Sequence, residues 1–272
     1  MIKNRIKTDI NENRKEVIII FIIIPIIVLI ASFLPLSMRD TLKVNLLDFN
    51  IITFYTAVFT HDSLEHFLGN IMVYYLYTFY AYLLSLISQR RKWFIRNYIL
   101  FFLILPPIMY TALISANRHY LGNIMHFSCG LSGILSAVLG LLPMSFIAFL
   151  KNSGIEVRSI EVFYLIILTS ALAIPYIYND SYLLLAIVPA IVYLVWRNRN
   201  GLKAISRFLK KLIYQDLFSS TLVVSVLILY FTGIAAIFPR TIFQEGILTD
   251  ILTHYIGWAA GLLISCFLMR YD

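Results

Sequence analysis

Eight apolar runs divide this chain of 272 residues and leave few folds open to it. A membrane-spanning helix needs about 20 mostly apolar residues, because its backbone polar groups must be satisfied within the segment. The runs that reach or approach this length are 17–36, 64–88, 98–115, 130–150, 160–178, 182–196, 217–238 and 249–268. Only 13% of the residues are charged, whereas soluble domains carry about 25%. The sequence therefore predicts an all-α, polytopic membrane helix bundle with about eight transmembrane helices.

The runs also predict how the chain is organised. Residues 1–16 form a polar tail, and residues 17–272 form one membrane domain without repeats or a soluble module. The runs within 160–196 predict an inserted helical hairpin, whose second helix is short and holds Pro189. The first run is too long for a signal peptide and has no small-residue cleavage site after it. Two cysteines make no disulfide framework.

The net charge of +8 would suit a nucleic-acid partner, but its distribution indicates topology instead. With the loops alternating between two sides, 18 of the 22 Lys and Arg residues fall on the side of the N-terminus. The positive-inside rule then predicts a multi-pass protein of the plasma (inner) membrane with both termini in the cytoplasm. The amphipathic segment 197–216 is expected to lie on the inner leaflet. The predicted partner is thus the lipid bilayer and not nucleic acid.

Polar side chains inside the apolar runs are costly in hydrocarbon and therefore indicate function. Four of them are Ser132, His254, His66 and Asn70. His66 and Asn70 are spaced i, i+4, which puts them on one face of a helix. Asp62 followed by Glu65 matches a capping arrangement, so this helix is expected to open near Asp62.

Small residues form two stripes at helical spacing. One comprises Gly133, Ser136 and Gly140, and the other Gly257 and Gly261, with His254 one turn earlier. Such stripes let two helix backbones approach closely, and plain helix packing is the alternative explanation for them. If the two stripes pack together, the Ser132 hydroxyl comes within reach of the His254 imidazole. A serine hydroxyl becomes a nucleophile only when a base takes its proton.

Three fragments together resemble the signature of the rhomboid intramembrane serine proteases. They are Gly130-Leu131-Ser132-Gly133, the stretch from His61 to Asn70, and the stretch from His254 to Gly261. The resemblance implies a six-helix core, to which the hairpin is added. It also implies that substrates are transmembrane proteins and that the site opens to the external side. No cofactor and no metal are implied.

The resemblance further implies residue roles. Ser132 would be the nucleophile and His254 the general base. The Ser132 backbone N–H and the side chains of His66 and Asn70 would form the oxyanion hole. Packing around these groups would depend on Gly130, Gly133, Gly140, Gly257 and Gly261.

The chain departs from the family in two respects. Many rhomboids have a tyrosine where Ser136 stands, so another residue, such as Tyr255, must support His254. Two helices are added before the helix 217–238, which by family analogy would form a lateral gate with Leu229, Tyr230, Phe231 and Phe238 near its outer end. Residues 37–63 would form a half-buried external loop, and His119 and His126 would have no role.

Other functions fit less of the sequence. A catalytically inactive rhomboid-fold protein that binds membrane helices would not need both Ser132 and His254. An unrelated polytopic carrier would be expected to show inverted repeats or broken helices, which the sequence lacks. Zinc bound by His61, His66 and His254 would leave the serine motif unexplained.

Overall fold

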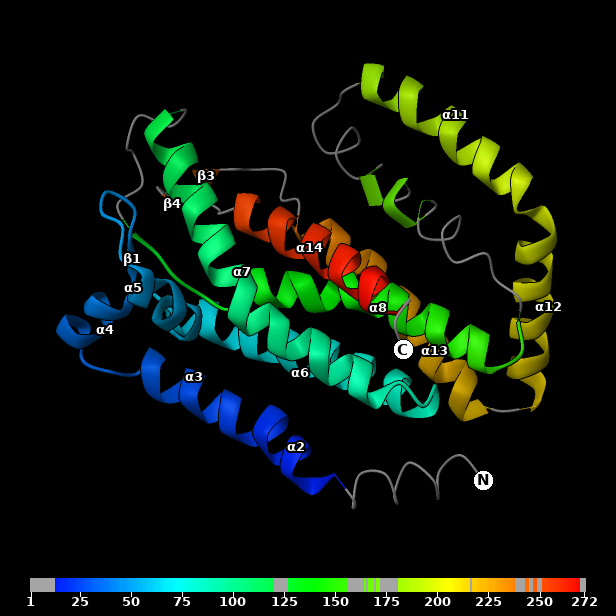
Figure 1. Ribbon diagram of the computed structural model, residues 1–272, viewed down its shortest axis with the longest axis horizontal. Helices are drawn as coiled ribbons and strands as arrows, with labels where there is room; N and C mark the ends of the chain where they lie inside the picture. The colour runs from blue at the N-terminus through cyan, green and yellow to red at the C-terminus, as the bar shows by residue number, and fades with distance from the viewer. Residues whose placement is uncertain are drawn as a thin grey trace.

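The computed structural model describes residues 13–119, 127–155, 181–215, 217–237 and 251–269, together with 164, 166–168, 170, 171, 243, 244, 247 and 248. Within these residues, six helices are long and apolar enough to cross a membrane. The protein is therefore a multi-pass, all-α membrane protein, as the apolar runs predict. Figure 1 shows the helices as a bundle from which one pair of helices extends at one side.

The first membrane helix is continuous from Arg14 to Ser32 and comprises α2 (Arg14–Ile18), the π-helical turn η1 (Ile19–Ile23) and α3 (Ile24–Ser32). The other five are α6 (Leu64–Ile87), α7 (Arg91–His119), α8 (Ser132–Asn152), α13 (Leu217–Ile237) and α14 (Ile251–Met269). All six correspond to predicted runs. The ends differ by a few residues, because polar residues at the membrane surface extend or shorten a helix without changing its apolar run.

Helix α8 is the centre of the bundle. In its most apolar stretch 94% of the residues are buried, compared with 33% in α14. Helices α6, α7, α13 and α14 pack around it. A helix that is apolar on all sides is expected in such a position. The Ser132 end of this central helix is therefore surrounded by other elements of the bundle.

The predicted hairpin 160–196 is described only in part. Its second helix is α11 (Ser181–Arg197), which has 17 residues, is shorter than each of the six spanning helices and is not one of them. Most of the run 160–178 lies outside the described residues, which contain six of the eight predicted spans. Helix α12 (Arg199–Gln215) follows α11 and packs Phe208 against Phe149 of α8, with ring centroids 6.1 Å apart.

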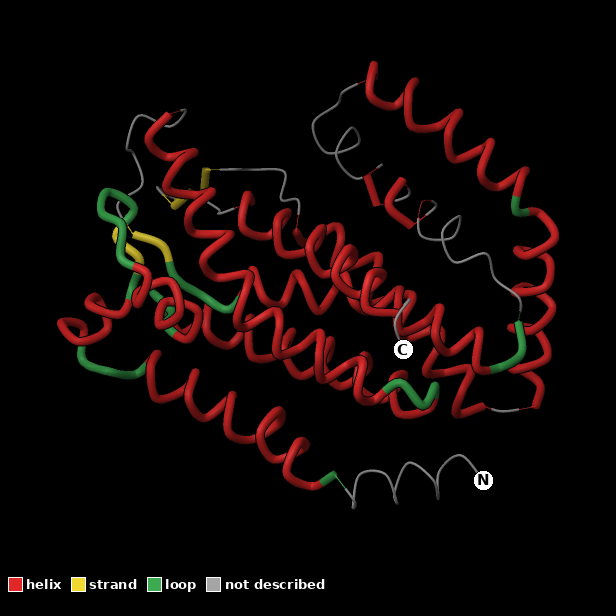
Figure 2. Tube along the Cα trace, viewed as in Figure 1, coloured by secondary structure: helices red, strands yellow, loops and turns green. Residues whose placement is uncertain are grey.

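The loop 37–63 is half-buried, as predicted. It contains α4 (Leu36–Leu42), β1 (Val44–Asn45), α5 (Ile51–Thr56) and the 3-10 turn η2 (Ala57–Phe59). Val44 and Phe54 are fully buried, whereas Phe49 and Ile52 are exposed. Two short antiparallel pairs are the strands of the described chain, visible in yellow in Figure 2. They are β1 with β2 (Phe127–Ser128), and β3 (Phe243–Gln244) with β4 (Ile247–Leu248).

Candidate active site

The turn before α8 lies directly on His66 and Asn70. Gly130 has φ +121°, a conformation that residues with a side chain rarely adopt. A Cβ atom at Gly130 would lie 2.9 Å from His66 Cε1, 3.1 Å from His66 Nε2 and 3.7 Å from Asn70 Nδ2. The Gly130 N–H donates to the Ala57 carbonyl oxygen at 2.9 Å, which holds the turn in place. Glycine is needed here for its conformation and because the two side chains leave no room.

Helix α6 begins one residue later than the capping pattern predicts. Ser63 is the N-cap, and its hydroxyl accepts from the His66 backbone N–H at 3.1 Å. The prediction that the helix opens near Asp62 is confirmed, but the cap is Ser63 and not Asp62. The Asp62 carboxylate lies 2.5 Å from the Lys43 ammonium instead. A serine hydroxyl satisfies the first turn equally well, since serine is among the preferred N-caps.

The two small-residue stripes pack against each other, as expected. A Cβ atom on Gly257 would lie 2.1 Å from the Gly133 carbonyl oxygen, and one on Gly261 would lie 2.2 Å from the Ala137 carbonyl oxygen. A Cβ atom on Gly140 would lie 2.4 Å from the Trp258 carbonyl oxygen. The backbones of α8 and α14 are thus in direct contact over two turns. The sequence analysis missed Ala137, although its i, i+4 spacing from Gly133 could have indicated it.

The register of this contact is parallel, because Gly133 meets Gly257 and Ala137 meets Gly261. Ser132 is the first residue of α8, and His254 lies in the first turn of α14. Both are half-buried. The Thr253 carbonyl oxygen lies 3.6 Å from the position of a Cβ atom on Gly133. The two predicted catalytic residues therefore lie at the same end of one closely packed helix pair.

Asn70 carries a buried amide nitrogen. Its side chain is 8% exposed, and Nδ2 has no hydrogen-bond partner among the described residues. A buried amide without a partner costs free energy. Its position beside Gly130 leaves this donor available to a ligand at the turn that leads into Ser132.

His61 contacts both Ser32 and His66. Its Nδ1 atom lies 3.0 Å from the Ser32 hydroxyl, and its ring packs edge-on against His66 with centroids 4.9 Å apart. Burial, together with the neighbouring His66, lowers the pKa of His61 to about 3. His61 is therefore neutral at physiological pH, and it links the end of α3 to the first turn of α6.

The loop 37–63 is connected to the turn before Ser132 by three side chains that are far apart in the sequence, Lys43, Asp62 and Cys129. Lys43 lies 2.8 Å from Asp40 as well as 2.5 Å from Asp62, and the Cys129 thiol donates to Asp62 Oδ2 at 3.3 Å. Burial raises the pKa of Cys129 to about 12, and the Asp62 charge adds to the rise. The thiol is thus protonated and acts as a hydrogen-bond donor. No local pattern could have indicated this group, because its members come from separate segments.

Support of His254 by Tyr255 stays a prediction. Tyr255 is 43% exposed, and its ring contacts Trp258 at 6.0 Å between centroids. Ser136 lies in the α8–α14 contact, because its Cβ is 3.2 Å from the position of a Cβ atom on Gly257. The Ser136 hydroxyl donates to the Ser132 carbonyl oxygen at 2.9 Å. Met109 of α7 reaches Gly133 and closes the same space from another side.

Helix α13 is attached differently from α14. Tyr230 is buried and its hydroxyl lies 2.5 Å from that of Ser170, while Leu229 is partly buried. Phe231, which was expected to belong to a lateral gate, is 55% exposed and thus lies mostly outside the contacts of α13 with its neighbours. Adjacent helical residues point about 100° apart, so Tyr230 and Phe231 cannot share one contact face. Phe238 lies outside the described residues.

The remaining two histidines, His119 and His126, have no predicted role. His119 is exposed at the end of α7, and His126 lies outside the described residues. Among the residues that the structure describes, no three His, Cys, Asp or Glu side chains are grouped so that they could bind a metal ion.

Comparisons with known proteins identify no relative of this chain: no family model, no curated protein and no solved structure matches it.

Proposed function

We propose that this protein is a rhomboid-type intramembrane serine protease, which hydrolyses peptide bonds in or near the transmembrane segments of membrane proteins. One observation carries the proposal more than any other. The glycine-mediated parallel contact of α8 and α14 lies beside a turn whose Gly130 rests on His66 and Asn70. Helix packing alone would require the glycines, but it would not require a serine, a histidine and a buried amide at one end of the contact.

The proposed reaction begins at Ser132. His254 accepts the hydroxyl proton as Ser132 Oγ attacks the scissile carbonyl carbon. The tetrahedral intermediate then expels the amine, which receives the proton from His254. A water molecule, deprotonated by the same imidazole, then attacks the acyl carbon. The second tetrahedral intermediate expels Ser132 Oγ, which receives this proton from His254, and the carboxylic acid is released. His254 thus acts as base and then acid in each half of the reaction, and the proposed reaction uses no cofactor.

The proposed oxyanion hole uses donors that α8 and α6 supply. The Ser132 N–H is at the first position of α8, where a backbone N–H has no partner within the helix. The Asn70 amide and the His66 ring lie on the other side of the Gly130 turn. Each preorganised donor of this kind contributes roughly 3–4 kcal/mol to transition-state stabilisation in serine hydrolases.

Substitution of the dyad tests the proposal. Ser132→Ala and His254→Ala are each expected to abolish cleavage of a model transmembrane substrate, with thermal unfolding in detergent unchanged. A fluorophosphonate probe is expected to label the wild-type protein at Ser132 and to leave Ser132→Ala unlabelled. Full cleavage by either variant would contradict the proposal. A wild-type protein that binds transmembrane peptides without labelling or cleavage would instead be an inactive rhomboid-fold protein.

The proposed orientation places both termini in the cytoplasm of a plasma-membrane protein and the Ser132 end of the bundle outside. It rests on the distribution of Lys and Arg. In a background without Cys129 and Cys266, Asp48→Cys is expected to react with an impermeant thiol reagent in intact cells, and Lys92→Cys and Lys203→Cys are expected to be protected. All three side chains replaced are exposed. The reverse pattern would invert the topology.

A further inference from the structure

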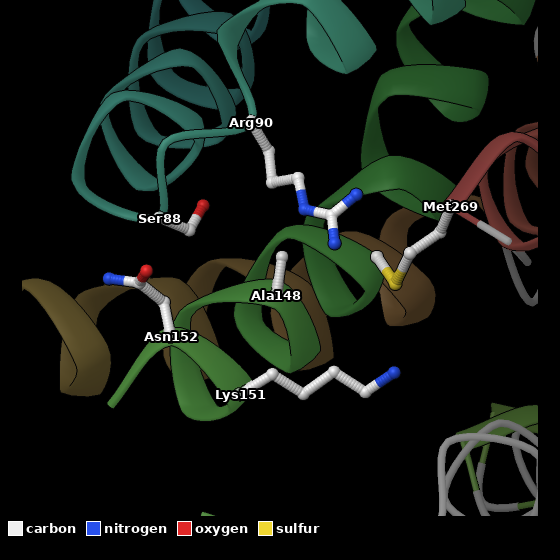
Figure 3. A pocket seen from close by; sticks show the side chains of 6 residues that line it. All are labelled: Ser88, Arg90, Ala148, Lys151, Asn152 and Met269. Carbon is white, nitrogen blue, oxygen red and sulfur yellow. The ribbon is translucent and has the colours of Figure 1, made fainter. Parts of the chain in front are cut away.

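A cavity of about 180 Å³ lies at the end of α8 opposite to Ser132. It is found where α6 ends, α7 begins and α8 and α14 end, so four membrane helices converge on it. Figure 3 shows the six side chains that line it, Ser88, Arg90, Ala148, Lys151, Asn152 and Met269. Because α8 has 21 residues and a helix rises about 1.5 Å per residue, this cavity is about 30 Å from the candidate active site.

Arg90 is the central polar group of the cavity. Its guanidinium extends from the α6–α7 connection toward Ala148 and Met269 (Figure 3). The Nη1 atom is buried and has no hydrogen-bond partner within the described residues. The adjacent Arg91 differs, because it forms an ion pair with Glu16. A buried guanidinium donor without an acceptor is costly, so this site favours an anion that supplies the acceptor.

The other polar side chains divide into two kinds. Ser88 and Asn152 are already engaged, since the Ser88 hydroxyl donates to the Leu84 carbonyl oxygen at 2.6 Å and Asn152 Nδ2 donates to that of Ile87 at 3.3 Å. Both side chains thus satisfy carbonyl oxygens in the last turn of α6. Lys151 is exposed and provides a second cation at the edge of the cavity.

The rest of the wall is apolar and comes from two helices. Ala148 of α8 is 5% exposed, and Met269 of α14 is 9% exposed. The cavity therefore offers two positive charges beside hydrocarbon, at a level where a membrane helix meets the headgroup region. Basic pockets between membrane helices bind the headgroups of anionic lipids.

We propose that this cavity is a binding site for a phosphate group, with Arg90 as the donor at its centre and Lys151 as the second cation. Guanidinium groups bind phosphate oxygens through two parallel hydrogen bonds, while an ammonium acts as a point charge. The phosphate belongs either to a phospholipid headgroup, whose first carbon atoms would contact Ala148 and Met269, or to a soluble phosphate compound. The site does not depend on the proposed protease activity.

Thermal unfolding of the full-length protein in a nonionic detergent tests this site. The probes are inorganic phosphate and a short-chain phosphatidylglycerol, each titrated against a neutral detergent blank. A saturable rise in unfolding temperature is expected, because a ligand that binds only the folded state stabilises it. Saturation by the lipid at concentrations at least tenfold lower than by phosphate would identify the headgroup as the ligand. Equal concentrations would identify the free phosphate group.

Variants connect the effect to the cavity. Arg90→Gln is expected to raise the concentration needed for half-saturation at least tenfold, and Lys151→Gln to raise it about threefold. Lys203→Gln removes the same charge from an exposed position on α12 and is expected to have no effect. If Arg90→Gln does not fold, Lys151→Gln decides, because this exposed side chain is not needed for packing. The proposal is overturned if neither probe gives a saturable shift, or if the shift is the same in the cavity variants as in Lys203→Gln.

Discussion

Helices α13 and α14 both border the central helix α8, but they are held to it in opposite ways. The α14 backbone touches that of α8 through Gly257 and Gly261, with no side chain between them. Helix α13 contacts its neighbours mainly through side chains. The Tyr230 hydroxyl contacts that of Ser170, and the side chains of Tyr77 and Leu139 lie against Gly233. The residues Val224, Ile228 and Phe231 on its outer face are exposed.

This difference indicates which parts of the bundle can move. Backbone atoms cannot change their positions by rotamer changes, so α8 and α14 can separate only by losing the whole contact. Side-chain contacts can be exchanged one at a time by rotamer changes. A transmembrane substrate is therefore expected to enter beside α13, while the pair that carries Ser132 and His254 stays together.

Alanine substitution in the α8–α14 contact is expected to have the largest effect. Gly257→Ala and Gly261→Ala place a Cβ atom 2.1 and 2.2 Å from carbonyl oxygens of α8, which no side-chain movement can relieve. We expect a loss of stability of about 1–3 kcal/mol. A displacement of about 1 Å at the site would also reduce cleavage on the order of 100-fold. Unfolding in detergent and initial cleavage rates measure the two effects.

Two further glycines complete this series. At Gly133 the new Cβ would meet the flexible Met109 side chain, so Gly133→Ala is expected to be milder. Gly69 has no atom within 4 Å of its Cβ position, although it lies between His66 and Asn70 in the sequence, so Gly69→Ala is expected to keep its stability. If all four variants behaved alike, backbone contact would not be the feature that holds α14.

Asn70→Ala tests the oxyanion side of the site. Removal of one donor is expected to lower kcat by about 10- to 1,000-fold while KM changes little, because the donor acts on the transition state. Stability is expected to be maintained, since Nδ2 has no partner among the described residues that would be lost. A change confined to KM would assign Asn70 to substrate binding instead.

Acidification is expected to weaken the fold at His61. Burial lowers the pKa of His61 to about 3 in the folded protein, and an unfolded histidine has a pKa of about 6.5. The unfolded state therefore takes up a proton first. The stability is fully present above about pH 6.5 and falls below it by up to about 1.4 kcal/mol per pH unit.

The unfolding temperature, measured between pH 7 and pH 5, checks this expectation. His61→Asn, which retains an acceptor for Ser32, is expected to show a smaller decrease over the same range. An equal decrease in both proteins would mean that other groups that titrate between pH 7 and pH 5 cause the loss.

The smallest effect is expected from a substitution in α13. Tyr230→Phe removes the hydrogen bond to Ser170, which contributes on the order of 1 kcal/mol. Looser attachment of α13 is expected to raise cleavage of a transmembrane substrate about two- to fivefold, and to change cleavage of a soluble peptide less. Phe231→Ala is the matched control, because that side chain is exposed. If cleavage of the two substrates rises equally, or if Phe231→Ala has the same effect, entry beside α13 is contradicted.

Several features of the fold are predictable from local sequence. The spans of α6, α8 and α14 follow from the lengths of their apolar runs, and the contact of α8 with α14 follows from glycines at i, i+4 spacing. The N-cap of α6 is Ser63 and not the predicted Asp62. Both residue types suit an N-cap, and the local sequence does not show that Lys43 forms an ion pair with Asp62. The exposure of Phe231 could not be predicted, because the sides of α13 are equally apolar in sequence.

The sequence alone determined that the chain is a bundle of membrane helices and which small residues allow two of them to touch. Hydrophobicity and helical periodicity are local properties, so a single segment reveals them. Three contacts became visible only in the folded protein. Gly130 rests on His66 and Asn70, and Lys43, Asp62 and Cys129 join the loop 37–63 to the turn before Ser132. Arg90 faces a cavity without a carboxylate partner among the described residues. These contacts join segments that are far apart in the chain, and their geometry depends on how the helices pack.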